Sequence, residues 1–285
     1  MSDYIGVFER KEVKYVLSAT QYERFRALVD PYMTLDVYGE ARVNSVYFDT
    51  PARELIERSL DKPLYKEKLR MRWYECAAAD ADAGADAADL AADPVFVELK
   101  KKFKGIVYKR RVSCSRKAAQ AYLLGICPYE EAVSIFPLDA QALADEELAP
   151  RSVQIAREID AFCARWNTLV PSMLISCDRI ALALREEFAA QENVRITFDT
   201  HLVYEDLAAS GAPEPSGQTH AILDPTCFVL EIKVAGPYPL WLVEALDACD
   251  IRPQSFSKYG EAYKLVMKTR VVSENALVRE EERCA

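Results

Sequence analysis

The sequence has few of the residues from which zinc sites and histidine-based catalytic triads are built. Its 285 residues include two histidines, and none of its eight cysteines forms a CxxC pair. The irregular spacing of the cysteines favours free thiols over a disulfide framework. No apolar run reaches membrane-spanning length, and no signal peptide opens the chain. We therefore expect a cytoplasmic protein with reduced cysteines and no direct membrane insertion.

The chain also lacks the excess of positive charge that is usual in proteins that bind nucleic acids. Its formal net charge is −9, which argues against a nucleic-acid partner. Much of the acidic excess falls in residues 77–94 and 139–147, outside the basic segments. Cations that cluster within an acidic protein indicate an enclosed site for a compact anion.

What the sequence does contain is a repeated alternation of basic and apolar residues. Within KEKLRMRWYE (66–75), one face of a predicted strand carries Lys68, Arg70, Arg72 and Tyr74. The other face carries Leu69, Met71 and Trp73. Related segments are VFVELKKKF, YKRRV, VRITFD and VLEIKV. About eight such strands, mostly adjacent in sequence, predict an α+β fold with an antiparallel β-barrel, closed or nearly closed, and flanking helices. We expect a single domain over 1–285, with a flexible Ala/Asp-rich loop at 77–94 and a frayed tail at 273–285.

Two interpretations of the basic strands stay open at this point. In one, the Lys and Arg tips lie in water on a solvated sheet face. In the other, the barrel closes into a tunnel whose interior holds Arg70, Arg72, Lys100, Lys109, Arg195 and Lys233. Unpaired buried cations cost several kcal/mol each, so such a tunnel requires a bound polyanion.

Isolated carboxylates on the same strand faces favour the tunnel. The pairs that share a face are Glu12 with Lys14, Glu98 with Lys100, and Glu231 with Lys233. A carboxylate can bind a hard divalent cation, while lysine and arginine bind phosphate oxygens. Phosphoryl transfer needs little more, because its catalysis is mostly positioning and charge stabilisation.

Nine motifs follow one another in an order that points to a known family. They are RKEVKY, VYFDT, KLRMRWY, VFVELKKK, VYKRR, CDRIAL, VRITFD, VLEIKV and SFSKYG. From about Phe8 to Tyr263 the chain resembles the catalytic domain of the vacuolar transporter chaperone (VTC) complex, the eukaryotic polyphosphate polymerase. That domain is a triphosphate tunnel metalloenzyme, with a C-terminal helix that caps one mouth of the tunnel.

The resemblance implies roles for individual residues. The implied catalytic residues, around the terminal phosphate of ATP, are Arg70, Arg72, Lys100 and Arg195. The implied binding residues for the phosphate chain are Lys14, Lys109, Arg111, Arg179, Ser257 and Lys258, to which strand parity adds Lys233. Glu231 is the implied ligand of Mn²⁺ or Mg²⁺. Further candidate ligands, each of which could instead pair with neighbouring cations, are Glu12, Glu98 and Asp199.

The chain departs from the hydrolase and cyclase branch of that superfamily at one position. Where that branch begins with E-x-E-x-K, this chain has Arg10, Glu12 and Lys14. Replacing a carboxylate by a cation removes a metal ligand and favours a tunnel that retains its anion. We expect neither the inositol-phosphate sensor nor the membrane helices of the eukaryotic complex in this chain; a separate membrane partner stays open.

Three functions are therefore compared. The first is an ATP-dependent polyphosphate polymerase, in which the γ-phosphoryl group passes to a growing phosphate chain and ADP leaves. The second is a tripolyphosphatase or nucleoside triphosphatase on the same fold, with water as acceptor. The third is a non-catalytic module that binds polyphosphate. A carboxylate such as Glu231 inside the tunnel argues against the third, because a pure anion binder gains nothing from it.

Overall fold

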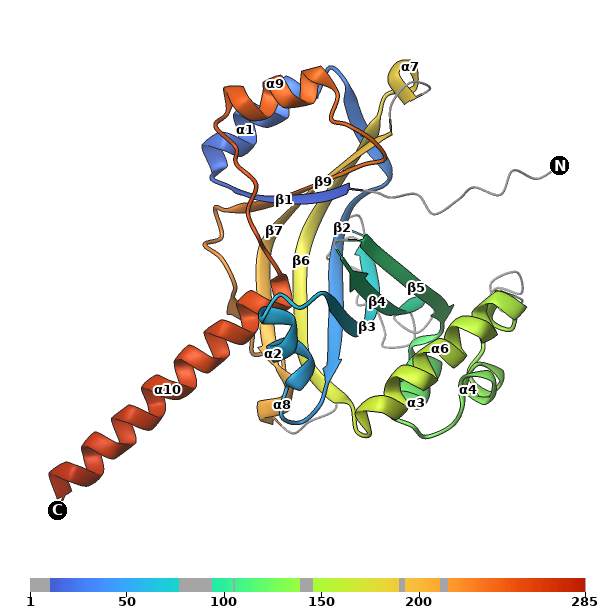
Figure 1. Cartoon of the computed structure of the whole chain (residues 1–285), viewed down its shortest axis with the longest axis vertical. Coiled ribbons are helices and arrows are strands. Elements are labelled where there is room, and N and C mark those ends of the chain that lie inside the picture. Colours follow the sequence, from blue (N-terminus) through green and yellow to red (C-terminus); the bar gives the residue numbers. More distant parts are fainter. Residues whose placement is uncertain are drawn as a thin grey trace, which may run out of the picture.

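The computed structural model describes residues 11–76, 94–104, 106–138, 146–189, 193–210 and 215–284. Their core is one strongly curved antiparallel sheet (Figure 1). In spatial order its strands are β1 (Lys11–Leu17), β9 (Phe228–Val234), β7 (Val194–Asp206), β6 (Val170–Leu184), β2 (Met33–Asp49), β3 (Tyr65–Cys76), β4 (Val95–Phe103) and β5 (Ile106–Cys114). A short ninth strand, β8 (His220–Ala221), pairs with β7. The predicted antiparallel, tunnel-like sheet of about eight strands is confirmed.

The two edges of this sheet approach each other without backbone pairing. Among the described strands, β1 pairs with β9 alone and β5 with β4 alone. A side-chain contact crosses the opening, because Lys100 Nζ on β4 lies 3.4 Å from Glu12 Oε1 on β1. The described strands therefore form an open, nearly closed sheet rather than a continuous barrel.

Helices cover the convex side of the sheet because the apolar residues of each strand point that way. Helices α1 (Ala19–Val29) and α9 (Leu240–Ala248) pack over β1, β9 and β7. Helices α3 (Arg116–Leu123), α4 (Tyr129–Ile135) and α6 (Pro150–Trp166) pack over β3, β4 and β5. The short helices α7 (Glu186–Ala189) and α8 (Leu207–Ser210) follow β6 and β7. Each strand thus keeps its other face for the concave side.

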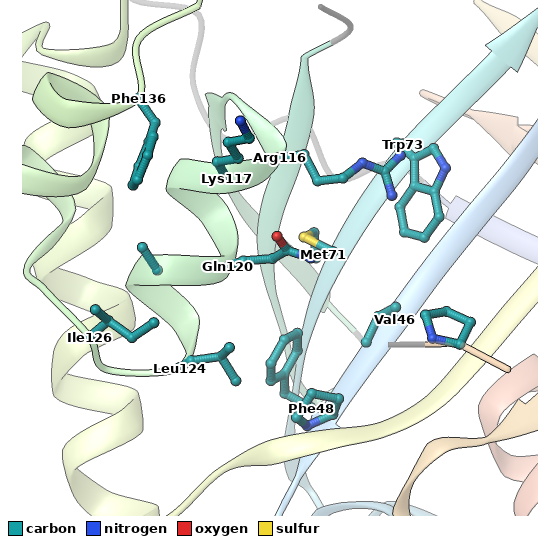
Figure 2. Close-up of a pocket in the computed structure, with 13 residues that line it drawn as sticks. Val46, Phe48, Met71, Trp73, Arg116, Lys117, Gln120, Leu124, Ile126 and Phe136 are labelled. Atoms are coloured by element: carbon teal, nitrogen blue, oxygen red, sulfur yellow. The ribbon is translucent and has the colours of Figure 1, made fainter. Parts of the chain in front are cut away.

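The convex side contains an apolar cavity of about 400 Å³ between α3 and the β2–β3 pair (Figure 2). Val46, Met71 and Trp73 line it, and the guanidinium of Arg116 lies 4.2 Å from the centre of the Trp73 ring. Since Met71 and Trp73 alternate with Arg70 and Arg72 along β3, the sheet separates this cavity from the basic face.

The C-terminal helix α10 (Lys258–Cys284) covers one end of the concave side, as the resemblance implied for a capping helix. Tyr259, Ala262, Tyr263 and Val266 pack there against apolar residues of β2 and β6 and against α2 (Glu54–Leu60). The Asp49 carboxylate fixes this junction, since it accepts hydrogen bonds from the backbone amides of Leu55 and Ile56 and from the Tyr259 hydroxyl at 2.7 Å. The Asp49 carboxylate therefore satisfies two backbone amides of the first turn of α2.

Several predicted features lie at or beyond the limits of the described residues. The loop from 77 to 93, residues 139–145 and Arg10 fall outside them. Helix α10 continues to Cys284, where we expected a frayed tail, and strong helix formers such as Ala, Leu, Glu and Arg fill that stretch. Within the described residues, the cysteines with free thiols are Cys114, Cys127, Cys163, Cys177, Cys227 and Cys249. No helix in the described part is long and apolar enough to cross a bilayer.

Candidate phosphate-binding tunnel

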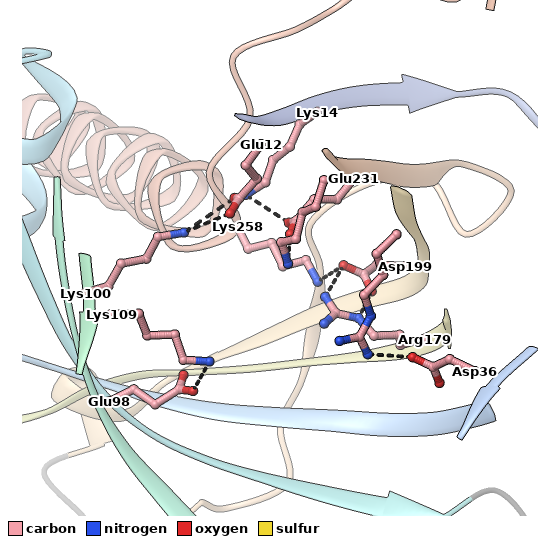
Figure 3. A network of polar contacts seen from close by, with 12 residues as sticks. Glu12, Lys14, Asp36, Glu98, Lys100, Lys109, Arg179, Asp199, Glu231 and Lys258 are labelled. Carbon is pink, nitrogen blue, oxygen red and sulfur yellow. Dashed lines mark hydrogen bonds and ion pairs between the residues drawn. The ribbon is translucent and has the colours of Figure 1, made fainter. Parts of the chain in front are cut away.

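The concave face gathers the cations and carboxylates predicted from strand parity (Figure 3). Glu98, at the centre of β4, is fully buried and contacts three cations. Its Oε2 lies 2.6 Å from Arg70 Nη2, and its Oε1 lies 2.8 Å from Lys109 Nζ and 2.5 Å from Arg111 Nη2. Burial alone would raise the pKa of the Glu98 carboxyl, but the neighbouring arginines and Lys109 lower it far below its ordinary value. Glu98 is thus an ionised counter-ion whose two oxygens are both occupied.

Asp199 on β7 is a second buried counter-ion, and one of its partners is Lys258, the first residue of α10. It accepts a bidentate pair from Arg179, at 2.6 and 2.8 Å, and contacts Lys258 Nζ at 2.5 Å. Lys258 Nζ also lies 2.9 Å from the Cys177 thiol. Although burial would raise the pKa of the Asp199 carboxyl, Arg179 and Lys258 lower it well below the usual range. This carboxylate ties the first residue of α10 to the sheet.

Two further carboxylates, Glu12 and Glu231, lie on the neighbouring strands β1 and β9. Register pairs Lys14 with Glu231 and Glu12 with Lys233. Lys14 Nζ lies 3.5 Å from an oxygen of Glu12 and 3.5 Å from an oxygen of Glu231, while Lys233 Nζ lies 2.5 Å from the other Glu231 oxygen. Burial opposes ionisation of Glu231, but Lys14 and Lys233 outweigh it and lower the pKa of that carboxyl well below its usual value.

The residues around Glu231 fit a hard divalent cation better than those around the other carboxylates. Glu12 and Glu231 flank one ammonium group at equal distances. Beside Glu231 in the sheet lies Thr197, whose buried hydroxyl has no hydrogen-bond partner among the described groups. Carboxylate and hydroxyl oxygens suit Mg²⁺ and Mn²⁺. The described residues contain no cluster of three acidic, cysteine or histidine ligands, so phosphate and water oxygens would have to complete the coordination.

The cations of β3 differ from those above in their partners. Arg70 Nη1 donates to the Tyr47 hydroxyl at 3.1 Å as well as pairing with Glu98. Arg72 Nε donates to Ser45 Oγ at 3.0 Å, and Lys68 Nζ donates to Ser257 Oγ at 2.9 Å. Neither Arg72 nor Lys68 has a carboxylate partner among the ion pairs found in the described ranges. Both therefore offer positive charge to a ligand.

The surplus of positive charge changes the acidity of its neighbours. Burial would raise the pKa of Tyr47, yet Arg70, Arg72 and Lys68 lower it to about 7. Burial lowers the pKa of Lys68 to about 8, and Lys66, Lys14 and Lys100 add to that effect. Such shifts are typical of a site prepared for an anion.

The predicted catalytic set is only partly brought together by direct contacts. Arg70 and Arg72 are alternate residues on the same face of β3, and the Lys100 side chain extends from β4 to Glu12 on β1. Arg195 lies near the start of β7, opposite Lys233 in the sheet register. Its side chain is 46 % exposed and contacts Asp36. Asp36 stands at the irregularity of β2 between Leu35 and Glu40. Which of these cations contact a reacting phosphate stays a prediction.

Sequence reasoning missed Lys68 and Tyr47 as members of this site. Lys68 has the same parity as Arg70 and Arg72, so the alternation of β3 contained the signal. Tyr47 is directly opposite Arg70 in the β2–β3 register. That pairing depends on strand register across 23 residues, which the sequence pattern alone does not fix.

The chain is similar in sequence to a known family over most of its length. The family model described as the VTC domain matches residues 9–267. The vacuolar transporter chaperone complex subunit 4 of Trypanosoma brucei brucei is 25 % identical over 284 residues, which cover 89 % of this chain and 34 % of that protein. The chain thus spans about a third of this curated relative. A solved structure of a proposed adenylate cyclase from Vibrio parahaemolyticus has a TM-score of 0.42 and 9 % identity, covering 89 % of this chain and 97 % of its own.

Proposed function

Because the chain belongs to the VTC domain family, we propose that it is an ATP-dependent polyphosphate polymerase. It would transfer the γ-phosphoryl group of ATP to the end of a growing phosphate chain and release ADP. The observation that supports this most is the concave face itself, where cations from β1, β3, β4, β5, β6, β9 and α10 surround a few carboxylates. A long polyanion is the ligand that such a surface neutralises best.

Transfer on this surface requires positioning and charge rather than a nucleophilic side chain. Arg70 and Arg72 can bind oxygens of the transferred phosphoryl group, and Lys100 can approach it from β4. The terminal oxygen of the acceptor chain attacks phosphorus in line, the bond to the β-phosphate oxygen breaks, and that oxygen leaves with ADP. The scarcity of histidine is compatible with this chemistry.

Glu98 and Asp199 would hold the cations in place before substrate binds. Because both oxygens of each carboxylate are already in ion pairs, Arg70, Arg111 and Arg179 keep fixed directions. Preorganised charges stabilise a transition state without reorganisation at the moment of reaction. Glu231, assisted by Glu12, would hold Mn²⁺ or Mg²⁺. When bound there, the metal ion would neutralise charge on the phosphate oxygens.

The Trypanosoma relative is named as a subunit of a complex, so we include a protein partner in the proposal. A membrane partner is one form that this assembly could take. The chemistry proposed for the tunnel does not depend on it.

The test is product analysis with purified protein, ATP and Mn²⁺. A ladder of polyphosphate with matching ADP is expected, and Arg72→Ala should lower synthesis by at least about a hundredfold because a transition-state charge is lost. Orthophosphate without a ladder would support a triphosphatase instead. Polyphosphate binding without turnover would support a binding module, and an active, folded Arg72→Ala protein would contradict the assigned role of Arg72.

A further inference from the structure

Lys68 is a third cation on the concave face of β3, two residues before Arg70. We propose that Lys68, held by Ser257 at the start of α10, binds a second phosphate residue beside the one bound at Arg72, and thereby selects linear oligophosphates over single phosphates. This inference deepens the proposed function and rests on it. It assigns a specificity role to Lys68, to which the resemblance gave no role.

The contacts of Lys68 separate it from most cations of the tunnel. Lys14, Arg70 and Arg179 each contact a carboxylate. Lys68 instead donates to a serine hydroxyl, and no carboxylate contacts it within the described ranges. A largely enclosed ammonium group without a counter-ion is costly, so the position favours a ligand that brings negative charge. Burial lowers the pKa of Lys68, whereas burial would raise the pKa of the neighbouring Tyr47, but Arg70, Arg72 and Lys68 itself lower it.

Ser257 holds the Lys68 side chain in place through a hydrogen bond. Its hydroxyl accepts from Lys68 Nζ and also from the backbone amide of Gly260 at 3.2 Å, which is the hydrogen bond of a helix N-cap. A side chain at Gly260 would meet Leu60 Cδ2 at 3.1 Å and Ser257 at 3.3 Å, so glycine allows α10 to approach this closely. Lys68 is thus attached to the fixed end of a helix rather than to a mobile loop.

Aromatic rings bound the same space. The Tyr47 and Tyr259 rings are stacked, with centroids 4.7 Å apart, and Lys68 Nζ lies 5.9 Å from the centre of the Tyr259 ring. Tyr259 is in turn held by Asp49 and Ser172. The Tyr259 ring therefore forms one wall of the space around the Lys68 ammonium group.

The spacing along β3 indicates a chain rather than one phosphate. Alternate residues of a strand are separated by about 7 Å, so the backbone positions of Lys68 and Arg72 are roughly 13 Å apart. Long side chains shorten this gap, but successive phosphates of one linear anion match a row of cations better than one tetrahedral ion does. Each charge-assisted hydrogen bond contributes enough to change affinity about tenfold.

The experiment compares binding of orthophosphate, pyrophosphate and tripolyphosphate by calorimetry, without ATP. The wild-type protein should bind tripolyphosphate more tightly than orthophosphate. Lys68→Met should weaken tripolyphosphate binding by about tenfold and change orthophosphate binding by less than about twofold. Lys68→Arg should recover part of the loss. Lys117→Met, an exposed lysine on the convex side, is the matched control and should bind all three ions as wild type does.

Each outcome bears on the proposal. Unchanged tripolyphosphate affinity in Lys68→Met, or equal losses for all three ions, would overturn the selective subsite. Circular dichroism and thermal unfolding of Lys68→Met show whether a loss of tripolyphosphate affinity comes from misfolding. If it does, the affinity of Lys68→Arg, relative to the wild type, tests the subsite instead. Since binding needs no turnover, a wild-type protein that shows the Lys68 effect but makes no ladder would lose only the polymerase proposal. A ladder with no Lys68 effect would remove only the subsite.

Discussion

The two sides of the tunnel balance their positive charge differently. The β3–β5 half has one carboxylate, Glu98, and the cations Lys68, Arg70, Arg72, Lys100, Lys109 and Arg111. The β1–β9 half contains Lys14 and Lys233 around two carboxylates, Glu12 and Glu231. The first half retains a surplus of positive charge, and the second is nearly neutral. If the proposed function is right, a phosphate chain would be attracted to β3, and the second half would provide oxygen ligands for a metal ion.

The largest test of this comparison removes the one carboxylate of the β3–β5 half. Glu98→Gln leaves Arg70, Lys109 and Arg111 without their shared counter-ion, and loss of one partner of a buried ion pair costs about 3–5 kcal/mol. We expect a loss of that order in the free energy of unfolding, measured with denaturant. Tripolyphosphate should recover part of it, because the anion replaces the missing charge.

Glu12→Gln is the comparison variant for that measurement. The Glu12 side chain is 20 % exposed and its ion-pair distances are longer, so its removal should cost about 1 kcal/mol or less. Equal losses in the two variants would show that the halves do not differ in the way described.

A test of intermediate size concerns the β1–β9 half. Glu231→Gln should weaken Mn²⁺ binding in the presence of tripolyphosphate by at least about tenfold, because an anionic ligand is lost. Free Mn²⁺ can be counted by electron paramagnetic resonance. Glu158→Gln, which disrupts ion pairs with Lys101 and Arg110 outside the tunnel, should leave Mn²⁺ binding unchanged. If Glu231→Gln binds Mn²⁺ with wild-type affinity, Glu231 is not the ligand of the metal ion.

Much of the fold could be predicted because strand periodicity is local. The alternation in KLRMRWY already assigns Arg70 and Arg72 to one face and Trp73 to the other. The first half of β2 could not be predicted in this way, because Gly39 and nearby charges interrupt its alternation and the strand is irregular there. That same irregularity puts Asp36 within reach of Arg195.

The division of roles among the carboxylates could not be predicted from sequence. Glu98 meets Arg70 and Arg111 because β4 pairs with both neighbouring strands in one register. A shift of one residue would turn these side chains to the opposite face. Similarly, the contact between Lys68 and Ser257 joins residues 189 positions apart. Only the folded arrangement shows which cations each carboxylate contacts, and through which oxygen.

The smallest expected effect is a titration that reports the surplus charge of the β3–β5 half. In the folded protein Tyr47 has a pKa of about 7, below the ordinary value of 10.0, so the folded state loses its proton first. This ionisation contributes no stability below about pH 7, and its contribution grows as pH rises toward about 10, because the unfolded state then binds more protons. The tyrosinate absorbance that develops near pH 7 should fall in Tyr47→Phe, which leaves the titration of Tyr74, whose pKa Arg72 lowers to about 8 against the effect of burial. It should persist in Tyr65→Phe, since burial and Glu67 raise the pKa of Tyr65 to about 12. Tripolyphosphate should move the Tyr47 titration upward by neutralising Arg72 and Lys68, and a titration indifferent to it would mean that the anion binds away from β3.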